Sequence, residues 1–240
     1  MQLSDVGAVT SCDACLAYEL NLCRAIVQVA KVSSAAVLQP SERTIPARRL
    51  ICRERELLEV VPIICQGWAA SAVTLPDGRR QILSFLLPGD IVSTAVIFDP
   101  VSPCSVESIT EVHYRTFKHT EVKAALLKHP GLFDRILKVC MDEKARADHL
   151  AVDLGRRAAD ERISRLILNL LERLAQRGLA RDHLMDFPLR QHHIADATGL
   201  TVVHVSKVLS EFRRAGLIEI NDRSLTISDI AGLRRIANMA

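Results

Sequence analysis

Three cysteines lie within twelve positions near the start of the chain, where residues 11–23 read SCDACLAYELNLC. Thiolates bind zinc and iron–sulfur clusters, and closely spaced thiols also take part in redox reactions. Cys12, Cys15 and Cys23 therefore form a candidate metal or redox site. A packing role for Cys15 and Cys23 is the alternative, because the stretch LAYELNLCRAI, which follows Cys15 directly and contains Cys23, reads as a helix.

The whole chain has seven cysteines, an odd number that does not readily make a disulfide framework. The first residues lack the basic and apolar segments of a secretion signal, and no apolar stretch is long enough to span a membrane. We therefore expect a cytoplasmic protein, in which grouped thiols indicate metal binding or redox chemistry. Cys52, Cys65 and Cys140 lie in apolar surroundings and are expected to be core residues.

An enzyme site is not evident. A β-barrel metalloenzyme would need several histidine or carboxylate ligands, and the β region offers only His113 and His119. The sequence contains no GxSxG motif and no glycine-rich phosphate loop. The chain is therefore predicted not to be an enzyme, with a small barrel metalloenzyme as the alternative that histidine substitution would test.

The segment from residue 36 to residue 119 carries short apolar runs separated by turn residues. The runs include VVPIICQGWAASAVTL, RRQILSFLL and IVSTAVIF, with PDG and PGD between them. Asp77-Gly78 between two strand-like runs is a strong hairpin signal, and Pro88-Gly89-Asp90 marks the next turn. The pattern predicts a small antiparallel sandwich or barrel.

Between residues 120 and 155 the apolar positions change to helical spacing. They include Leu132, Ile136, Val139, Leu150 and Leu154. A long helix is expected here, and a second copy of the chain is the simplest cover for its apolar side. A charge at Ile136 or Val139 is therefore expected to produce monomers. Another helix is predicted over 159–177, with Gly178 at its end.

Residues 191–210, QHHIADATGLTVVHVSKVLS, fit a helix-turn-helix. The motif needs a small residue where the helices cross, a glycine at the turn and apolar residues between the helices. Ala195 and Gly199 supply the first two, and Thr201 is placed to cap the second helix. The packing residues are Ile194, Leu200, Val205 and Val208. Two short strands predicted in LIEINDRSLTIS add a wing, so this region is predicted to bind DNA; an ordinary helical hairpin is the alternative.

In such a motif the second helix enters the major groove. Its candidate DNA-binding residues are Thr201, Val202, Val203, His204, Ser206 and Lys207. Lys207 is suited to guanine, Ser206 to a base edge, and the valines to a thymine methyl group. Arg213, Arg214 and Arg223 are candidates for phosphate contact, or else ordinary surface charges. From residue 155 onward the chain has fourteen Lys and Arg against ten Asp and Glu, whereas the first 154 residues have seventeen against eighteen.

A β domain, a long helix and a winged helix in this order resemble the CRP/FNR family of bacterial transcription regulators. The stretches GWAASAVTLPDGRRQILSFLLPGDIV and PLRQHHIADATGLTVVHVSKVLSEFRRAGLIEI are similar to its sensor and DNA-binding domains. The resemblance implies an α+β chain with a homodimer, a palindromic double-stranded DNA site and contact with RNA polymerase. Its parts would be a cysteine-containing segment (1–35), an antiparallel β jelly-roll domain of the cyclic-nucleotide-binding type (36–119), a dimerisation helix (120–155) and a winged helix-turn-helix (156–240).

The chain departs from the family pattern in more than two places. Members that bind cyclic AMP hold its ribose and phosphate with a glycine-glutamate pair and an arginine, and IVSTAVIFDPVSPCSVES contains neither, so no cyclic nucleotide is expected. FNR-like proteins usually have glutamate, serine and arginine where this chain has Val203, Ser206 and Lys207. The target half-site is therefore expected to differ from the usual FNR box or to be read less stringently.

The FNR branch holds an oxygen-labile [4Fe-4S] cluster on three N-terminal cysteines and a fourth from the β domain. The resemblance implies that Cys12, Cys15 and Cys23 bind such a cluster, which would sense oxygen or nitric oxide. The family's fourth position falls near Tyr114, and Cys104, expected to be exposed in a turn, is the nearest substitute. Zinc accepts the same thiolates, so zinc, thiol oxidation, an unidentified ligand or control by expression level remain as alternatives.

Overall fold

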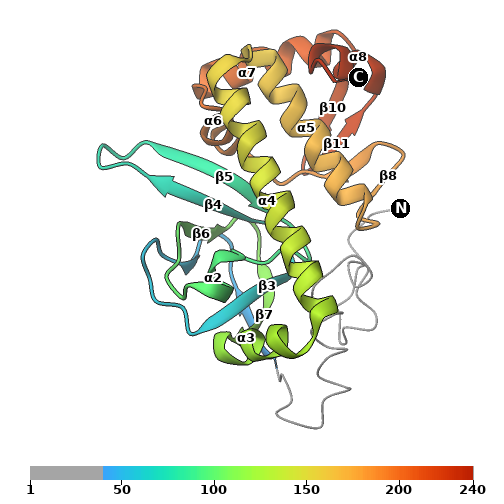
Figure 1. Cartoon of the computed structure of the whole chain (residues 1–240). Helices are drawn as coiled ribbons and strands as arrows, with labels where there is room; N and C mark the ends of the chain where they lie inside the picture. The colour runs from blue at the N-terminus through green and yellow to red at the C-terminus, as the bar shows by residue number, and fades with distance from the viewer. Residues whose placement is uncertain (1–39, 240) are drawn as a thin grey trace.

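The computed structural model describes residues 40–239 and contains two domains that a long helix, α4, connects (Figure 1). Cys12, Cys15 and Cys23 lie outside the described residues. The first domain consists of β1 (Ser41–Ile45), β2 (Leu50–Cys52), β3 (Val60–Gln66), β4 (Ala69–Thr74), β5 (Arg80–Leu86), α2 (Ala95–Phe98), β6 (Ser105–Ser108) and β7 (Val112–Lys118). No described helix is both long enough and apolar enough to cross a membrane.

The strands of this domain form two antiparallel sheets, ordered β1-β7-β3 and β2-β6-β4-β5. One core cluster joins them, with Ile64 and Val112 from the first sheet and Cys52 and Val106 from the second. The predicted sandwich is confirmed. The hairpin expected at Asp77-Gly78 joins β4 to β5, where Gly78 has φ +87°, a conformation that glycine adopts without strain.

The apolar run IVSTAVIF differs from the other two because most of it is not a strand. Ile91 makes a single bridge to Ile63, and Ala95–Phe98 forms the short helix α2. Val96 and Ile97 are fully buried. A short apolar run fits a buried strand and a buried helix equally well, so periodicity could not distinguish them.

Two helices occupy the region where the sequence pattern predicted one. They are α3 (His119–Lys128) and α4 (Pro130–Arg156). His129 between them is extended, with φ −129° and ψ 91°, as expected for a residue that precedes a proline. The prediction of a single helix over 120–155 was therefore wrong at its first third, although α4 is the long helix expected after it.

The C-terminal domain consists of α5 (Ala159–Ala175), β8 (Ala180–Arg181), β9 (Leu184–Asp186), α6 (Gln191–Thr198), α7 (Val202–Arg214), β10 (Ile218–Asn221), β11 (Ser224–Ile227) and α8 (Ile230–Ile236). Its strands form one sheet in the order β10-β11-β9-β8. The apolar residues of α5 pack in the core, and Gly178 follows the helix with φ +68°. The helix predicted over 159–177 is confirmed, ending two residues early.

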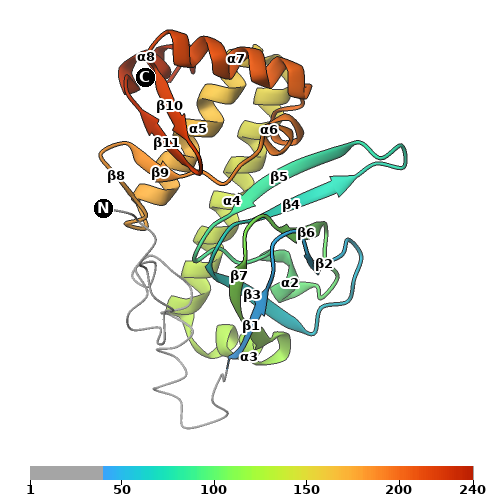
Figure 2. The same cartoon turned by 180° about the vertical axis from the view of Figure 1, so that it is seen from behind.

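The β4–β5 hairpin leaves the sandwich and packs against the C-terminal domain (Figures 1 and 2). Trp68, Ile82 and Phe85 belong to the same buried cluster as Ile163 and Leu170 of α5. The two domains therefore share one hydrophobic core.

A buried ion-pair cluster joins the domains beside this core. The carboxylate of Asp90, in the Pro88-Gly89-Asp90 turn, accepts hydrogen bonds from Arg173 Nη2 and Arg177 Nη2, each at 2.6 Å. The Leu87 backbone N–H donates to the same carboxylate at 2.8 Å. All three charged side chains are largely buried. This turn is thus a contact between domains as well as a turn between strands.

Candidate DNA-binding site

The two helices of the predicted motif meet at Gly199, which lies at the C-terminal end of α6 with φ +66°. A side chain here would place its Cβ 3.0 Å from Leu154 Cδ2 of α4. Ala195 is buried at the crossing, as the sequence pattern predicted. The turn therefore needs glycine for its backbone conformation, and Leu154 of α4 packs close against it.

Thr201 caps α7. Its hydroxyl oxygen accepts a hydrogen bond from the His204 backbone N–H at 3.2 Å, which satisfies one of the free donors of the first turn. The predicted cap is confirmed.

We expect Thr201→Ala to lower the free energy of unfolding by about 1 kcal/mol, because the first turn of α7 loses its side-chain acceptor. Urea denaturation would measure the change. Thr201→Ser keeps the oxygen and should retain most of the stability, so equal losses in both variants would show that the hydroxyl is not the stabilising group.

The exposed face of α7 carries the residues predicted to meet DNA. Val205 and Val208 are buried with Leu209 and Phe212. On the opposite side Val203 is 79% exposed, Lys207 is exposed and Ser206 is half-buried. Val202, His204 and Thr201 are exposed on the first turn. The structure thus brings these six side chains to one free end of the helix.

The predicted wing is present as the β10–β11 hairpin, in which Ile218 pairs with Ile227 and Asn221 with Ser224. Arg223 is exposed in its turn, and the Arg223 carbonyl accepts a hydrogen bond from the Phe187 backbone N–H at 2.6 Å. Arg213 and Arg214 are exposed in the last turn of α7. Cationic side chains therefore flank the exposed face of α7.

One residue that supports this site was missed by the sequence analysis. The Nδ1 atom of His193 accepts a hydrogen bond from the Arg190 backbone N–H at 3.1 Å, so this histidine caps the start of α6. Burial lowers the pKa of His193 to about 4, with smaller contributions from His192 and Arg80, so the ring is neutral at neutral pH. The spacing of three residues between Arg190 and His193 is the signal that could have indicated the cap.

Cys104 is not exposed, contrary to the sequence-based expectation. Cys104 lies just before β6 and only 5% of its surface is exposed. It belongs, with Cys52, to the core cluster between the two sheets. Burial raises the pKa of the Cys104 thiol to about 11, with a smaller contribution from Cys52. Residues 40–239 contain no group of three or more potential ligands that could hold a metal ion.

Comparisons with known proteins identify both domains. A model of cyclic nucleotide-binding domains matches residues 42–129, and a model of Crp-like helix-turn-helix domains matches residues 161–236. The nitrogen fixation regulation protein FixK of Bradyrhizobium diazoefficiens is 33% identical over 164 residues, which cover 68% of each chain. The chain belongs to the CRP/FNR family.

Other CRP/FNR proteins are also similar to this chain over most of its length. The transcriptional activator protein FnrL of Cereibacter sphaeroides is 28% identical over 199 residues, covering 80% of this chain and 78% of its own. A solved structure of FixK2 from Bradyrhizobium japonicum superposes with a TM-score of 0.77 at 26% identity, covering 85% of this chain and all of that one. The chain is thus a DNA-binding transcription regulator of this family, and its relatives are regulators and not enzymes.

Proposed function

We propose that this CRP/FNR-family regulator acts as a homodimer that places α7 of each copy in the major groove of a palindromic site. The supporting observation is the exposed end of α7, where Val203, Ser206 and Lys207 lie on one face behind a capped first turn. The proposal also includes contact with RNA polymerase and a location in the cytoplasm.

Lys207 is proposed to read a base, and Arg223 to contact a phosphate. We expect Lys207→Ala to weaken binding to the preferred site by about 1–3 kcal/mol and to reduce discrimination at one base pair. Arg223→Ala should weaken binding to all sequences alike and reduce the slope of log affinity against log salt by about 1. Fluorescence anisotropy on selected and scrambled palindromes at several salt concentrations would measure both. Identical effects of the two variants on all sequences would contradict the assignment of Lys207.

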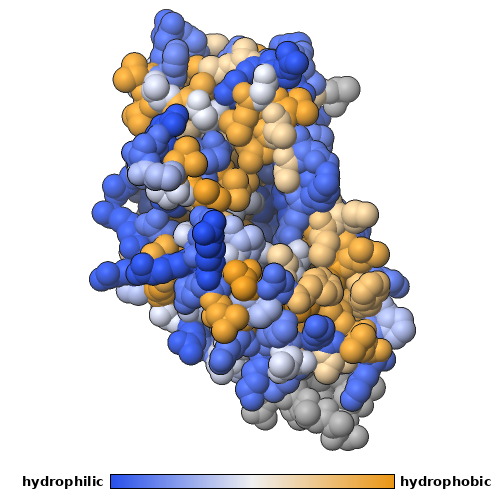
Figure 3. All heavy atoms as spheres, turned by 60° about the vertical axis from the view of Figure 1, so that its left-hand side comes forward, coloured by the Kyte–Doolittle hydropathy of each residue, from blue (hydrophilic) through white to orange (hydrophobic). Residues whose placement is uncertain are grey.

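We propose α4 as the dimer interface, through a stripe of exposed apolar side chains. The stripe consists of Phe133, Leu137, Met141 and Val152. Figure 3 shows hydrophobic side chains gathered on the side where α4 crosses the β domain. Ile136, which the sequence analysis placed at the interface, is 1% exposed and packs in the core cluster with Phe117 and Leu126. The interface is therefore proposed on the other side of the helix from Ile136.

For the signal, we propose that Cys12, Cys15 and Cys23 bind a [4Fe-4S] cluster that senses oxygen or nitric oxide, and Cys104 is the candidate to be tested as fourth ligand. The triad supports this by its spacing alone. Cys104 does not fit in the described conformation, because a buried thiol with a pKa of about 11 is neither accessible nor deprotonated. As fourth ligand it would first have to leave the core of the sandwich.

Iron and acid-labile sulfide measured on protein purified without oxygen would test the cluster. We expect about four of each per chain, with a visible absorption band that decays in air and is lost in Cys12→Ser. Loss of the band in Cys104→Ser would support the fourth ligand, whereas an unchanged band would exclude it. Cys140→Ser serves as the control, since Cys140 is a partly buried thiol of α4.

A regulator without a cluster is the second candidate, and the burial of Cys104 favours it. Zinc, thiol oxidation, an unidentified ligand or expression level would then control DNA binding. Colourless protein free of iron that cannot be reconstituted would support this candidate. For either candidate we propose that no cyclic nucleotide is bound, because the segment from 91 to 108 has no arginine and its side chains Val92, Val96 and Val106 are buried.

A further inference from the structure

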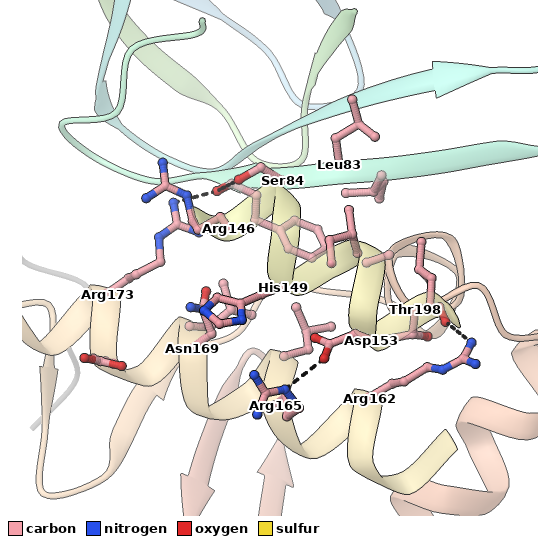
Figure 4. Close-up of a pocket in the computed structure, with 18 of the residues that line it drawn as sticks. Leu83, Ser84, Arg146, His149, Asp153, Arg162, Arg165, Asn169, Arg173 and Thr198 are labelled. Atoms are coloured by element: carbon pink, nitrogen blue, oxygen red, sulfur yellow. Dashed lines mark hydrogen bonds and ion pairs between the residues drawn. The ribbon is translucent and has the colours of Figure 1, made fainter. Parts of the chain in front are cut away.

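A cavity of about 250 Å³ lies between the two domains, outside the core of the β sandwich. Its walls come from β5, α4, α5 and the end of α6 (Figure 4). A hollow between the domains is visible in Figure 3. The cavity is slightly smaller than the roughly 300–1,000 Å³ typical of ligand pockets, so any occupant would be small.

The lining combines apolar walls with a positive charge. The apolar part includes Phe85, Leu150, Leu154, Leu166, Leu170 and Met239. Four arginines and two carboxylates also line the cavity, which gives a formal net charge of +2. A cavity with apolar walls and a few cationic groups favours an amphipathic anion.

Two of the four arginines already have carboxylate partners. Arg165 Nε lies 2.9 Å from Asp153 Oδ1, and Arg173 Nη2 lies 2.6 Å from Asp90 Oδ2. Arg173 nevertheless retains a buried Nε–H without an acceptor among the described residues. Asp90 is shared between Arg173 and Arg177, so one carboxylate balances two buried guanidinium groups.

The other two arginines have no carboxylate within ion-pair distance in the described part of the chain. Arg162 donates only to the carbonyls of Arg157 and Thr198, at 2.9 and 3.1 Å. Arg146 lines the cavity together with Arg173, and the carboxylate of Glu143, whose charge interacts with that of Arg146, accepts a hydrogen bond from the Thr94 hydroxyl. The side-chain amide of Asn169, which also lines the cavity, has no hydrogen-bond partner among residues 40–239. These groups are donors without a full set of acceptors.

We propose that this cavity binds a small organic anion, with its carboxylate or phosphate group at Arg146 and Asn169 and its apolar part against Phe85 and Leu170. The cavity stays accessible in the proposed dimer, because Met141 and Val152 lie on the opposite side of α4 from Arg146 and Leu150 at 3.6 residues per turn. An occupant touches both domains. Its role as an effector of DNA binding rests on the function proposed above.

Binding of octanoate and octyl phosphate to the full chain tests the site, with 1-octanol as the neutral analogue. The chain has a single tryptophan, Trp68, whose ring centroid lies 6.5 Å from that of Phe85, so its fluorescence should report an occupant. Calorimetry would give the affinity. We expect at least one of the two anions to bind tenfold or more tightly than octanol, and the tighter of the two identifies the head group.

Arg146→Gln should weaken binding of that anion at least tenfold, and Asn169→Leu should also weaken it. Arg135→Gln, an exposed arginine of α4 that does not line the cavity, is the matched control and should bind normally. Octanol binding as tightly as the anions, or unchanged affinity in Arg146→Gln, would overturn the proposal.

Fluorescence anisotropy with a palindromic DNA tests the effector role separately from anion binding. A change in DNA affinity on adding the anion to wild type, absent in Arg146→Gln, supports an effector. Anion binding without any change in DNA affinity overturns the effector role. Absence of DNA binding under all conditions would instead count against the proposed function.

Discussion

Replacing Met141 with aspartate should convert the proposed dimer into monomers. Met141 is 61% exposed in the middle of α4, within the stripe of Phe133, Leu137 and Val152. In a helix pair this position would be buried, and a carboxylate facing its own copy would have neither water nor a counter-ion. Monomers hold only one recognition helix each, so affinity for a palindrome should fall on the order of 100-fold or more.

Sedimentation velocity would measure the change in mass, and anisotropy the change in affinity. Ala147→Asp introduces the same charge at an exposed position of α4 outside the stripe, and it should remain dimeric. Ile136→Asp should differ from both, because it places a carboxylate in the core and lowers stability. A dimeric Met141→Asp protein that binds the palindrome normally would show that the interface lies elsewhere.

Replacing Asp90 with alanine should cause a large loss of stability. The substitution leaves the guanidinium groups of Arg173 and Arg177 buried between the domains without their shared carboxylate, and it frees the Leu87 N–H. Removing one partner of a buried ion pair typically costs about 3–5 kcal/mol. We expect a decrease of that size in the free energy of unfolding, measured by urea denaturation.

Asp77→Ala is the matched control, because Asp77 pairs with Arg79 at the exposed tip of the β4–β5 hairpin. Its stability should stay close to that of wild type, since exposed ion pairs contribute little. Asp90→Asn keeps the shape and removes only the charge, so it should lie between the other two. Equal stability of Asp90→Ala and Asp77→Ala would show that the interdomain ion pairs do not stabilise the fold.

The helix-turn-helix could be predicted from the sequence because its determinants are local. Ala195, Gly199 and Thr201 lie within seven residues, and each acts on backbone that is close to it in the chain. The hairpin at Asp77-Gly78 is local in the same way. Short-range patterns of this kind depend on turn geometry and capping, which few other arrangements satisfy.

Contacts between distant segments could not be predicted. The pattern on α4 revealed apolar positions, but it did not show that Ile136 would face the core while Met141 stayed exposed. The exposure of Cys104 was misjudged for the same reason. A proline before a residue indicates a turn, but it does not show that the residue will be buried between two sheets. The bond between Asp90 and Arg173 joins residues 83 positions apart. Such pairings follow from the assembled fold and not from local propensity.

The core that Trp68, Ile82 and Phe85 share with α5 also limits how the protein can be recombined. Two-domain regulators are often described as a sensor domain and an exchangeable DNA-binding domain, with the boundary in the linker between them. A chimera joined between α4 and α5 would divide this core cluster between two proteins and would also remove the Asp90 ion pairs. Each part would then expose apolar surface, and the arginines would lack their carboxylate. A change of target specificity is therefore more accessible through substitutions on α7 than through exchange of whole domains.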